Sequence, residues 1–536
     1  MTVEKNELIL AVDLGTSGPK VGLFTLRGES LGYESEPTPI QLQPGGGAEQ
    51  DPAGWWNAIV RATRRLLARG LAPVDNIVAF SCTTQWAGTV PVDRNGEPLM
   101  NAIIWMDSRG APYVRRITGG PVELEGYGLD KLLAWVRLTG GIPGHAGKDS
   151  IAHILWLKHE RPDVYRAAFK FLEPMDYINL KLTGRFAASH ATIQITWVTD
   201  NRDINHIRYD PGLLRLSTID PDKLPELKGC AEVLGPLKPQ IAAELGLPER
   251  VQVVTGTSDM ASAAIGSGAV RDYQPNLYIG TSSWLMCHVP YKKSDLFRNQ
   301  ASIPSGIPGK YILTNEQECA GACLNYLRDN VLFHPEELIQ EEGTTTVYQA
   351  FDRMADRVAP GSDRVLFTPW LYGERTPVED HLVRGGFTNL SLHTTREHLV
   401  RSVLEGVAFN TRWLLGGVES FIGRQLDSLP LIGGGANSRT WCQIFADVLN
   451  RPIKQLKDPA LCNARGAAYL AGVALGRLQF DDIPQLVQVE RTLQPNPAHR
   501  AYYDEMFKQF VAIYKSNGRI YRALNGGRSD ENGRYS

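Results

Sequence analysis

Asp13-Leu14-Gly15-Thr16-Ser17-Gly18 is a short turn-forming stretch between two strand-like runs, Leu8–Val12 and Val21–Leu26. A similar stretch, Gly280-Thr281-Ser282-Ser283, comes between two further strand-like runs about half the chain later. Each pattern predicts a β-hairpin whose tight turn gathers backbone N–H groups and hydroxyls in one small space. Such a turn can cradle phosphate oxygens. Two copies predict a duplicated scaffold whose halves hold one nucleotide between them.

The two stretches differ at one chemically important position. Two residues before its glycine, the first stretch carries Asp13, whereas the second carries Tyr278. An aspartate beside a phosphate cradle suits Mg²⁺, which prefers one or two carboxylates together with waters and phosphate oxygens. We therefore expect Asp13 to be the carboxylate for Mg²⁺, and Thr16, Ser17 and Lys20 to face the phosphates. The alternative is a tight β-turn without a ligand, which the second copy disfavours.

Neither of the common nucleotide-binding loops fits the first stretch. The Walker pattern GxxxxGK[ST] is absent, and the residues that follow alternate as a strand instead of opening a helix. A Rossmann fingerprint also requires a helix at that point. The hairpin is the interpretation that remains.

Composition excludes several classes of protein. The 536 residues are too many for one core, and 43% apolar with 21% charged residues is typical of a globular protein. The net charge of -2 offers no basic surface to nucleic acid or a membrane. The sequence has no run of about 18 apolar residues, so it predicts no transmembrane helix. Seven scattered cysteines and the lack of an apolar leader predict a cytoplasmic protein. Small molecules are the expected partners, and a homodimer is an open alternative.

The order of strand-like and helix-like runs indicates an α/β protein with two domains. The first domain is expected at 1–265 and the second, which opens with the second hairpin, at 266–500. A helical, frayed tail is expected at 501–536, because its last residues are polar and rich in glycine.

Several segments carry signals for their local structure. Asp51-Pro52 predicts the start of a helix, because aspartate caps free N–H groups and proline fits the first turn. Thr394 with Glu397 resembles a capping box that heads a long helix to about Phe421. The polar segment 199–228 is expected to be a loop over the surface.

Asp259 is a candidate catalytic group. It follows a strand-like run, Val251–Thr255, and opens a helix-like one. The helix macrodipole at such a position favours the ionised carboxylate. An ionised carboxylate in a cleft can accept the proton of a substrate hydroxyl as its oxygen attacks phosphorus. The alternative is an ordinary helix cap, and the sequence alone does not separate the two.

Leu431–Asn437 ends a strand-like run in three glycines and opens a helix. Glycines let the backbone approach a flat ligand closely, and a helix start favours polar or anionic groups. A strand-to-helix turn without a ligand is the alternative, since Ser438 stands where GxGxxG needs its third glycine. The candidate ligand-binding residues are Gly434, Gly435, Ala436 and Asn437.

Two clusters of a tryptophan with polar neighbours lie near predicted strand ends in the first half. One is Gln85-Trp86-Ala87-Gly88, and the other is Trp105-Met106-Asp107-Ser108-Arg109. Trp86 or Trp105 could stack on a sugar face while Gln85 and Asp107 bind its hydroxyls. Core packing is the alternative for an isolated tryptophan, but two such clusters favour a binding site.

Longer motifs accompany these stretches: Glu49-Gln50-Asp51-Pro52 with Trp55-Trp56, Tyr372–Pro377, Glu405–Phe409, Leu431–Asp447 and Asn463–Ala468. With them, the chain resembles the FGGY carbohydrate kinases of the actin-like and Hsp70-like ATPase superfamily, and looks closest to their xylulokinase branch. The resemblance covers nearly the whole chain.

The resemblance implies two RNase H-like domains with ATP and a sugar in the cleft between them. It also implies Asp259 as the general base beside the sugar, and Asp13 as the carboxylate associated with Mg²⁺. The implied phosphate contacts are Thr16, Ser17, Gly280 and Thr281. Residues 434–437 would line the adenosine site.

Two positions depart from the family pattern. Trp86-Ala87 stands where xylulokinases have a Met-His pair that contacts the ketose, and Ser189-His190-Ala191-Thr192 replaces Ser-Asp-Ala-Ser. We expect transfer of the ATP γ-phosphate to a hydroxyl of a ketose or polyol, with xylulose, another pentulose and a tetritol as open alternatives.

Hypotheses from other classes are an actin-like ATPase acting on a protein partner and a sugar sensor without catalysis. ATP consumption without sugar would indicate the ATPase, whereas the presence of Asp13 and Asp259 argues against the sensor.

Overall fold

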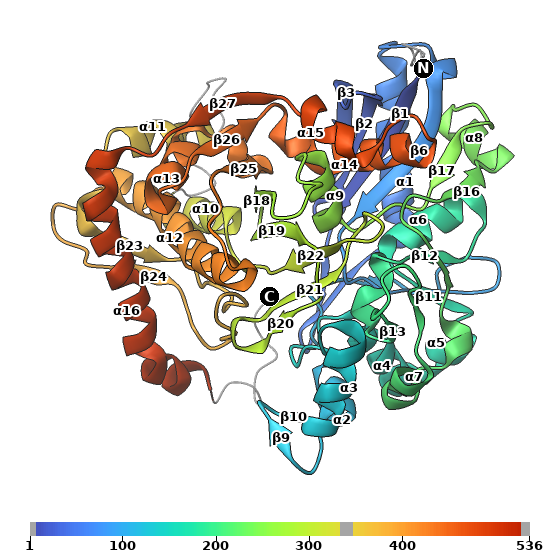
Figure 1. Ribbon diagram of the computed structural model, residues 1–536, viewed down its shortest axis with the longest axis horizontal. Coiled ribbons are helices and arrows are strands. Elements are labelled where there is room, and N and C mark those ends of the chain that lie inside the picture. The colour runs from blue at the N-terminus through green and yellow to red at the C-terminus, as the bar shows by residue number, and fades with distance from the viewer. Residues whose placement is uncertain (1–6, 333–346, 527–536) are drawn as a thin grey trace.

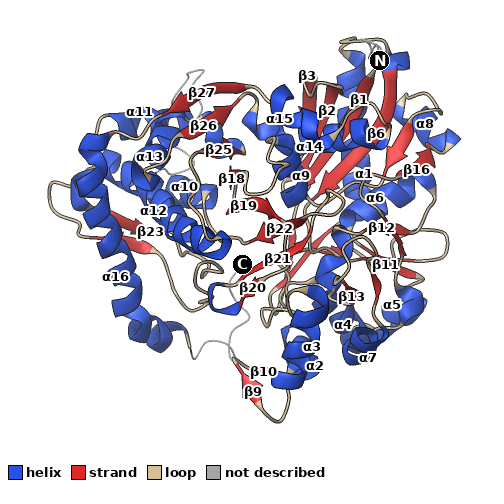
Figure 2. Ribbon diagram, viewed as in Figure 1, coloured by secondary structure: helices blue, strands red, loops and turns tan. Residues whose placement is uncertain are grey.

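Two mixed β-sheets, one in each lobe, organise the chain (Figure 1). The computed structural model describes residues 7–332 and 347–526. The N-terminal lobe, blue to green, lies on the right of the view, and most of the C-terminal lobe, yellow to red, lies on the left. Helices flank the sheet of each lobe (Figure 2).

The sheet of the N-terminal lobe has six strands in the order β16-β17-β6-β1-β2-β3. Its first three strands in sequence form an antiparallel meander, two more run parallel to β1, and β16 is an antiparallel edge. The strands are β1 (Leu8–Gly15), β2 (Gly18–Thr25), β3 (Ser30–Ser35), β6 (Ile77–Thr84), β16 (Val233–Pro236) and β17 (Gln252–Val254).

The sheet of the C-terminal lobe has eight strands in the order β20-β21-β22-β19-β18-β25-β26-β27. Here too, an antiparallel meander begins the lobe, two strands run parallel to its first strand, and an antiparallel strand closes the edge. The strands are β18 (Pro275–Ile279), β19 (Ser283–Val289), β20 (Ser294–Asp295), β21 (Gln300–Pro304), β22 (Tyr311–Thr314), β25 (Leu429–Ile432), β26 (Ile453–Leu456) and β27 (Val489–Leu493).

The two sheets therefore share one strand order, with β18, β19 and β22 in the places of β1, β2 and β3. The hairpin of β1 and β2 turns between Gly15 and Gly18, and that of β18 and β19 turns between Ile279 and Ser283. Both predicted hairpins are present, and the expected duplication of the scaffold is confirmed.

The other elements cover and connect the sheets. The helices are α1 (Pro52–Ala68), α2 (Ala111–Thr118), α3 (Leu129–Thr139), α4 (Ser150–Glu160), α5 (Pro162–Ala167), α6 (Pro174–Thr183), α7 (Pro211–Ser217), α8 (Pro239–Leu245), α9 (Asp259–Gly266), α10 (Gly321–Leu327), α11 (Val347–Asp356), α12 (Arg396–Ile422), α13 (Arg439–Leu449), α14 (Cys462–Ala474), α15 (Ile483–Leu486) and α16 (Arg500–Asn525). Short strands outside the two large sheets are β4 (Gln41–Gln43), β5 (Gly47–Gln50), β7 (Val90–Val92), β8 (Ala102–Ile103), β9 (Glu123–Leu124), β10 (Tyr127–Gly128), β11 (Lys170–Leu172), β12 (Ala187–Ser189), β13 (Thr199–Asp200), β14 (Arg208–Tyr209), β15 (Glu226–Lys228), β23 (Leu366–Thr368) and β24 (Gly386–Thr388).

Helix α1 starts where the sequence predicts. The side chain of Asp51 accepts a hydrogen bond from the N–H of Ala53, and Pro52 occupies the first turn. The helix then buries Trp55 and Ile59 in the core of the N-terminal lobe. The cap and the buried apolar face therefore both stabilise this helix.

The long helix α12 begins one residue later than expected. Its N-cap is Thr395, whose N–H donates to Nδ1 of His398 in a capping box. Thr394 is used elsewhere, since its hydroxyl accepts the N–H of Ser391. The predicted pairing of Thr394 with Glu397 is therefore wrong, although the helix and its end at Ile422 agree with the prediction.

The segment 199–228 is not a plain loop. It contains helix α7, capped by Asp210, whose carboxylate accepts the N–H of Leu213 at 2.8 Å. Leu213 and Leu214 are buried in a small core beneath it. The abundance of proline and aspartate, which led to the loop prediction, reflects helix starts inside the segment.

One helix from each half of the chain crosses to the sheet of the other half. Ala464 and Ala468 of α14 pack against β1 and β6 of the N-terminal lobe, as Figure 1 shows for the helix. In turn, Ala261 and Ala264 of α9 pack in a cluster with side chains of β19 and β25. The lobes are joined by these exchanged helices as well as by the chain itself.

Helices α9 and α14 cross in direct backbone contact. A Cβ on Gly266 would lie 1.9 Å from the carbonyl oxygen of Cys462, and one on Gly466 would lie 1.9 Å from that of Ser262. The hydroxyl of Ser262 donates to the carbonyl of Asn463 at 2.8 Å. Glycine is required at both positions because any side chain would separate the helices.

Helix α16, which covers most of the expected tail, buries Tyr503, Met506 and Phe510 in the core of the C-terminal lobe. Residues 527–536, where fraying was expected, lie outside the described residues. Among the helices that the structure describes, none has the length and apolarity that crossing a membrane requires.

Candidate active site

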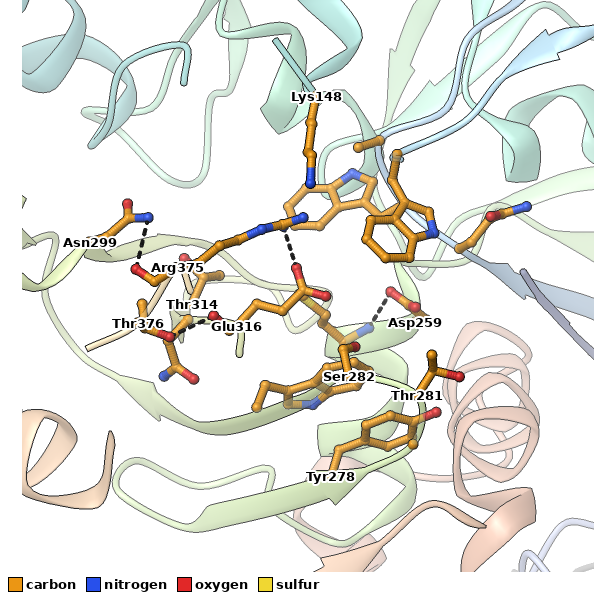
Figure 3. A pocket seen from close by; sticks show the side chains of 18 of the residues that line it. Lys148, Asp259, Tyr278, Thr281, Ser282, Asn299, Thr314, Glu316, Arg375 and Thr376 are labelled. Atoms are coloured by element: carbon orange, nitrogen blue, oxygen red, sulfur yellow. Dashed lines mark hydrogen bonds and ion pairs between the residues drawn. The ribbon is translucent and has the colours of Figure 1, made fainter. Parts of the chain in front are cut away.

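A large cavity lies between the two lobes, with a volume of about 1370 Å³. The turn after β1 and the turn after β18 both line it, through Gly15–Gly18 and Gly280–Ser282. Figure 3 shows side chains entering it from several directions, with Thr281 and Ser282 on the opposite side from Lys148. The two predicted cradles therefore open into one space.

Asp13 lies at the end of β1, where the strand meets the turn. It is only 4% exposed and lines the cavity. Lys20, its partner across the hairpin, places Nζ 3.6 Å from Oδ2 of Asp13. A carboxylate and an ammonium group thus stand together beside the turn, where both can interact with a charged ligand.

Side-chain N–H donors hold the first turn in shape. The indole N–H of Trp105 donates to the Thr16 hydroxyl at 2.9 Å, and Nε2 of Gln50 donates to the Thr16 carbonyl at 2.8 Å. Gln85 extends the chain by donating from Nε2 to Oε1 of Gln50 at 2.7 Å. Oε1 of Gln85, which also lines the cavity, has no hydrogen-bond partner among the described residues.

The second turn has an aromatic ring in the place of Asp13. Tyr278 stacks on Trp284 with ring centroids 3.8 Å apart. Burial, followed by the charges of Asp13 and Asp259, raises the pKa of the Tyr278 phenol. The lobes therefore share a hairpin, but only the N-terminal one contributes a carboxylate at this position.

Asp259 begins α9, as predicted, and lines the cavity. Its Oδ1 accepts the N–H of Met260 at 2.8 Å. Burial, followed by the negative charge of Asp13, raises its pKa to about 8. The helix macrodipole favours the ionised carboxylate, as expected, but burial and the charge of Asp13 act against it and outweigh it.

The two tryptophans of the predicted sugar site both line the cavity, together with Ala87. The indole N–H of Trp86 donates to the carbonyl of Thr192 at 2.9 Å, which fixes the ring as one wall. Asp107 is placed differently from the prediction. It is 1% exposed, lies outside the lining, and its carboxylate binds Arg109 and the N–H of Ala48.

The glycine run after β25 lines the C-terminal side of the cavity through Gly434, Gly435 and Asn437. Ala436 is fully buried and lies outside the lining, so of the four predicted residues it is the one turned into the core. Gly433 has φ +88° and approaches β18 so closely that a Cβ would lie 2.5 Å from the carbonyl oxygen of Ile279.

A group of charged residues that no sequence motif paired lies at the cavity, with Lys148, Glu316 and Arg375 in its lining. Arg375 donates from Nε to Glu318 and from Nη1 to Glu316, both at 2.6 Å. Lys148 of the N-terminal lobe places Nζ 3.4 Å from Oε1 of Glu318. Figure 3 shows Lys148, Arg375 and Glu316 in the cavity. The guanidinium also lies over the ring of Trp105, 5.6 Å from its centroid.

This group joins the two lobes, because Lys148 and Trp105 belong to one and the other three residues to the second. Nη2 of Arg375 is buried and has no hydrogen-bond partner among the described residues. The motif Tyr372–Pro377 contained a signal for Arg375, but no local pattern pairs it with Lys148.

Models of two protein domains match the chain in sequence. The N-terminal domain of the FGGY family of carbohydrate kinases matches residues 8–266, and the C-terminal domain matches residues 276–475. Together they span both lobes and both turns. The chain belongs to the FGGY family of carbohydrate kinases.

Individual carbohydrate kinases are similar over almost the full length. A xylulose kinase of Staphylococcus epidermidis is 28% identical over 531 residues, which cover 96% of this chain and 98% of the relative. A gluconokinase of Bacillus subtilis is 25% identical, covering 89% of this chain and 90% of the relative. The crystal structure of a gluconate kinase from Lactobacillus acidophilus has a TM-score of 0.82 at 25% identity, covering 97% and 99% of the two chains.

The family membership confirms the expected two-domain fold and identifies the protein as an ATP-dependent carbohydrate kinase. ATP and a sugar are thus its substrates. The actin-like ATPase with a protein partner, the alternative from another class, has no support among these relatives.

Proposed function

We propose that the protein transfers the γ-phosphoryl group of ATP to a primary hydroxyl of a neutral ketose or polyol, with Asp259 as the general base. The observation that carries this proposal is the position of Asp259. Its carboxyl lines the same cavity as both Gly-Thr-Ser turns and lies near enough to Asp13 to be affected by its charge.

The reaction needs one proton transfer and one phosphoryl transfer. Asp259 accepts the proton of the acceptor hydroxyl as that oxygen forms a bond to the γ-phosphorus, and the bond from phosphorus to ADP breaks. A carboxylate with a pKa near 8 is a stronger base, once ionised, than one with an ordinary pKa. Because the transition state is loose, orientation by the two turns contributes much of the rate.

The residues around the first turn fit a Mg²⁺ ion carried by ATP. The described residues contain no group of three His, Cys, Asp or Glu side chains that could bind a metal together. Asp13 alone suits Mg²⁺, which takes its remaining ligands from waters and phosphates. When bound, the ion would neutralise part of the phosphate charge. Thr16, Ser17 and Thr281 would orient the phosphates through their N–H groups and hydroxyls.

The charged residues around Arg375 favour a neutral substrate over a sugar acid. Arg375 is already paired with Glu316 and Glu318, and Glu318 also pairs with Lys148. The charges of Glu316 and Glu318 already balance those of Arg375 and Lys148. A substrate carboxylate beside them would therefore find no free cation and would be repelled by the glutamates. Gln85 and Arg375 both line the cavity, and their polar side chains suit hydroxyl groups, which both donate and accept.

The test is a screen of ADP release with pentuloses, tetritols, hexuloses and gluconate as acceptors. We expect kcat/KM for the best ketose or polyol to exceed that for gluconate by at least about 10-fold, or about 1.4 kcal/mol. A preference for gluconate would overturn the neutral-substrate assignment. Equal ADP release with and without any sugar would overturn the proposed transfer itself.

A further inference from the structure

A second cavity lies outside the catalytic one, on the C-terminal lobe. It has a volume of about 580 Å³, within the range of small-molecule sites. Four arginines line it: Arg298 after β20, Arg412 of α12, Arg451 after α13 and Arg500 at the start of α16. We call it the rear pocket. Residues far apart in the sequence thus bring four guanidinium groups to one hollow.

In the part of the chain that the structure describes, the arginines of the rear pocket outnumber the carboxylates that pair with them. Arg412 and Arg500 share one carboxylate, that of Asp504. Arg451 pairs with Glu419 at 3.0 Å, and Arg298 pairs with Asp295 at 2.7 Å. Among the described residues, three carboxylates therefore pair with the four guanidinium groups, which leaves an excess of one positive charge.

The arginines also repel one another. Burial, together with the charges of Arg500 and Arg451, lowers the pKa of Arg412 below its ordinary value in spite of its contact with Asp504. Arg412 also lies over the ring of Phe507, 4.6 Å from its centroid, and this contact orients the side chain. An anion between these groups would relieve the repulsion.

The floor of the rear pocket is an open helix face. Gly416 and Gly417 of α12 line it, and no described atom outside the helix backbone and the two neighbouring residues lies within 4 Å of where a Cβ on Gly416 would stand. The missing side chains leave room against the helix, while Trp413 and Phe507 supply apolar surface beside the arginines. The site is therefore hollow, cationic and partly apolar.

We propose that the rear pocket is a binding site for a phosphate group, either free phosphate or a small phosphate ester. Guanidinium groups recognise phosphate oxygens with paired N–H donors, and an apolar wall suits the carbon chain of an ester. Phosphate with two negative charges matches a pocket with an excess of cations better than a neutral sugar does.

The rear pocket and the catalytic cavity share a wall. Pro377 and Val378 line the rear pocket, whereas Arg375 and Thr376, just before them, line the catalytic cavity. Asn299, next to Arg298, lines the catalytic cavity and donates from Nδ2 to the carbonyl of Arg375 at 3.4 Å. An anion bound to Arg298 would therefore affect the position of Asn299, and through it the position of Arg375.

The test is calorimetric titration of the full-length protein with inorganic phosphate and, separately, ribose 5-phosphate. The catalytic cavity is filled beforehand with a saturating non-hydrolysable ATP analogue and Mg²⁺. We expect one site with a Kd below about 1 mM for at least one ligand. Binding of ribose 5-phosphate at least about 10-fold tighter than phosphate assigns the site to an ester, and equal binding assigns it to the free ion.

Two variants at one position give a matched pair. Gly416→Glu places a carboxylate and its bulk in the rear pocket, and we expect it to abolish the saturable heat. Gly416→Ala adds one methyl group in open space at a helical position and should bind within about twofold of the wild type. Absence of binding by the wild type, or unchanged binding by Gly416→Glu with both ligands, would overturn the proposal.

A third variant guards against a loss of binding through misfolding. Arg500→Gln removes one of the two cations that share Asp504, on an exposed side chain that is outside the catalytic cavity. It should weaken phosphate binding at least about fivefold while the melting temperature stays within about 2 °C of the wild type. Unchanged affinity in this variant would also contradict the assignment.

Discussion

The carboxyl of Asp259 is buried near Asp13. Burial, followed by the negative charge of Asp13, raises the pKa of Asp259 to about 8. The carboxyl must be ionised to accept a proton, so activity should depend on pH in the neutral range. We expect kcat/KM to fall as the pH drops below about 8, with a limiting slope of one proton. A pH profile from 5 to 9, measured with saturating Mg²⁺, checks this, and a flat profile above about pH 6 would contradict it.

Replacing Asp259 by Asn should separate catalysis from folding. We expect turnover to fall by roughly 10²–10⁴ while the Kd for ATP changes by less than about threefold. ADP release and equilibrium titration with an ATP analogue measure the two quantities. Normal turnover in this variant would remove Asp259 from the mechanism.

The same variant should be more stable than the wild type at alkaline pH. A carboxyl whose pKa is raised in the folded state contributes stability below the unfolded value near 3.8, and this contribution is lost as the pH rises towards 8. Asn carries no such cost. Asp259→Asn should therefore raise the melting temperature by at least about 2 °C at pH 8.5 and by less near pH 5, as thermal denaturation would show. An increase that is the same at both pH values would point to packing instead.

Trp105 and Trp86 offer a matched pair, because each indole N–H has a different partner. Trp105→Phe removes the hydrogen bond to the Thr16 hydroxyl in the first turn, and should raise KM for ATP about fivefold, as expected for about 1 kcal/mol. Trp86→Phe removes the bond to the Thr192 carbonyl and should change KM for the acceptor instead. Steady-state kinetics with each substrate varied in turn distinguish the two variants. If both variants changed both KM values equally, the assignment of Trp105 to ATP and Trp86 to the acceptor would be contradicted.

Arg375 should affect the acceptor more than the nucleotide. Arg375→Gln leaves Glu316 without its cation and Glu318 with Lys148 alone, so we expect KM for the acceptor to rise at least about 10-fold and KM for ATP to change less than about threefold. Adding Glu316→Gln removes the unpaired charge and should recover part of the loss. A double variant that is worse than the single one would show that Glu316 has a separate role.

The two hairpins and the helices that begin at Pro52 and Asp259 could be predicted from the sequence because their signals are local. Gly-Thr-Ser turns, Asp51 as a cap and the apolar run of β1 each act within a few residues. The prediction for α12 missed by one residue because Thr394 and Thr395 both suit an N-cap, and only the contact of Thr394 with Ser391 decides between them.

What the sequence could not provide was the pairing of residues across the cavity. Lys148 meets Glu318, and Trp105 meets Arg375, only after the two lobes have come together. Asp107 shows the converse, since a polar residue beside a tryptophan was expected in the sugar site and is instead a buried partner of Arg109. The pKa of Asp259 likewise depends on Asp13, which is far away in the sequence.

The crossing of α9 and α14 should be the most sensitive point of the fold. A methyl group on Gly466 would lie 1.9 Å from the carbonyl oxygen of Ser262, a separation that only a shift of one helix can relieve. Gly472 lies further along the same helix, and the nearest atom to its Cβ, on Leu478, would be 3.4 Å away. Gly466→Ala should therefore lower the free energy of unfolding by about 2–4 kcal/mol, whereas Gly472→Ala should leave it within about 1 kcal/mol of the wild type. Urea denaturation of both variants measures the difference. Because α14 packs on the N-terminal sheet and α9 on the C-terminal one, the loss in Gly466→Ala should appear as earlier unfolding of both lobes, and equal stability of the two variants would mean that the helices can separate at little cost.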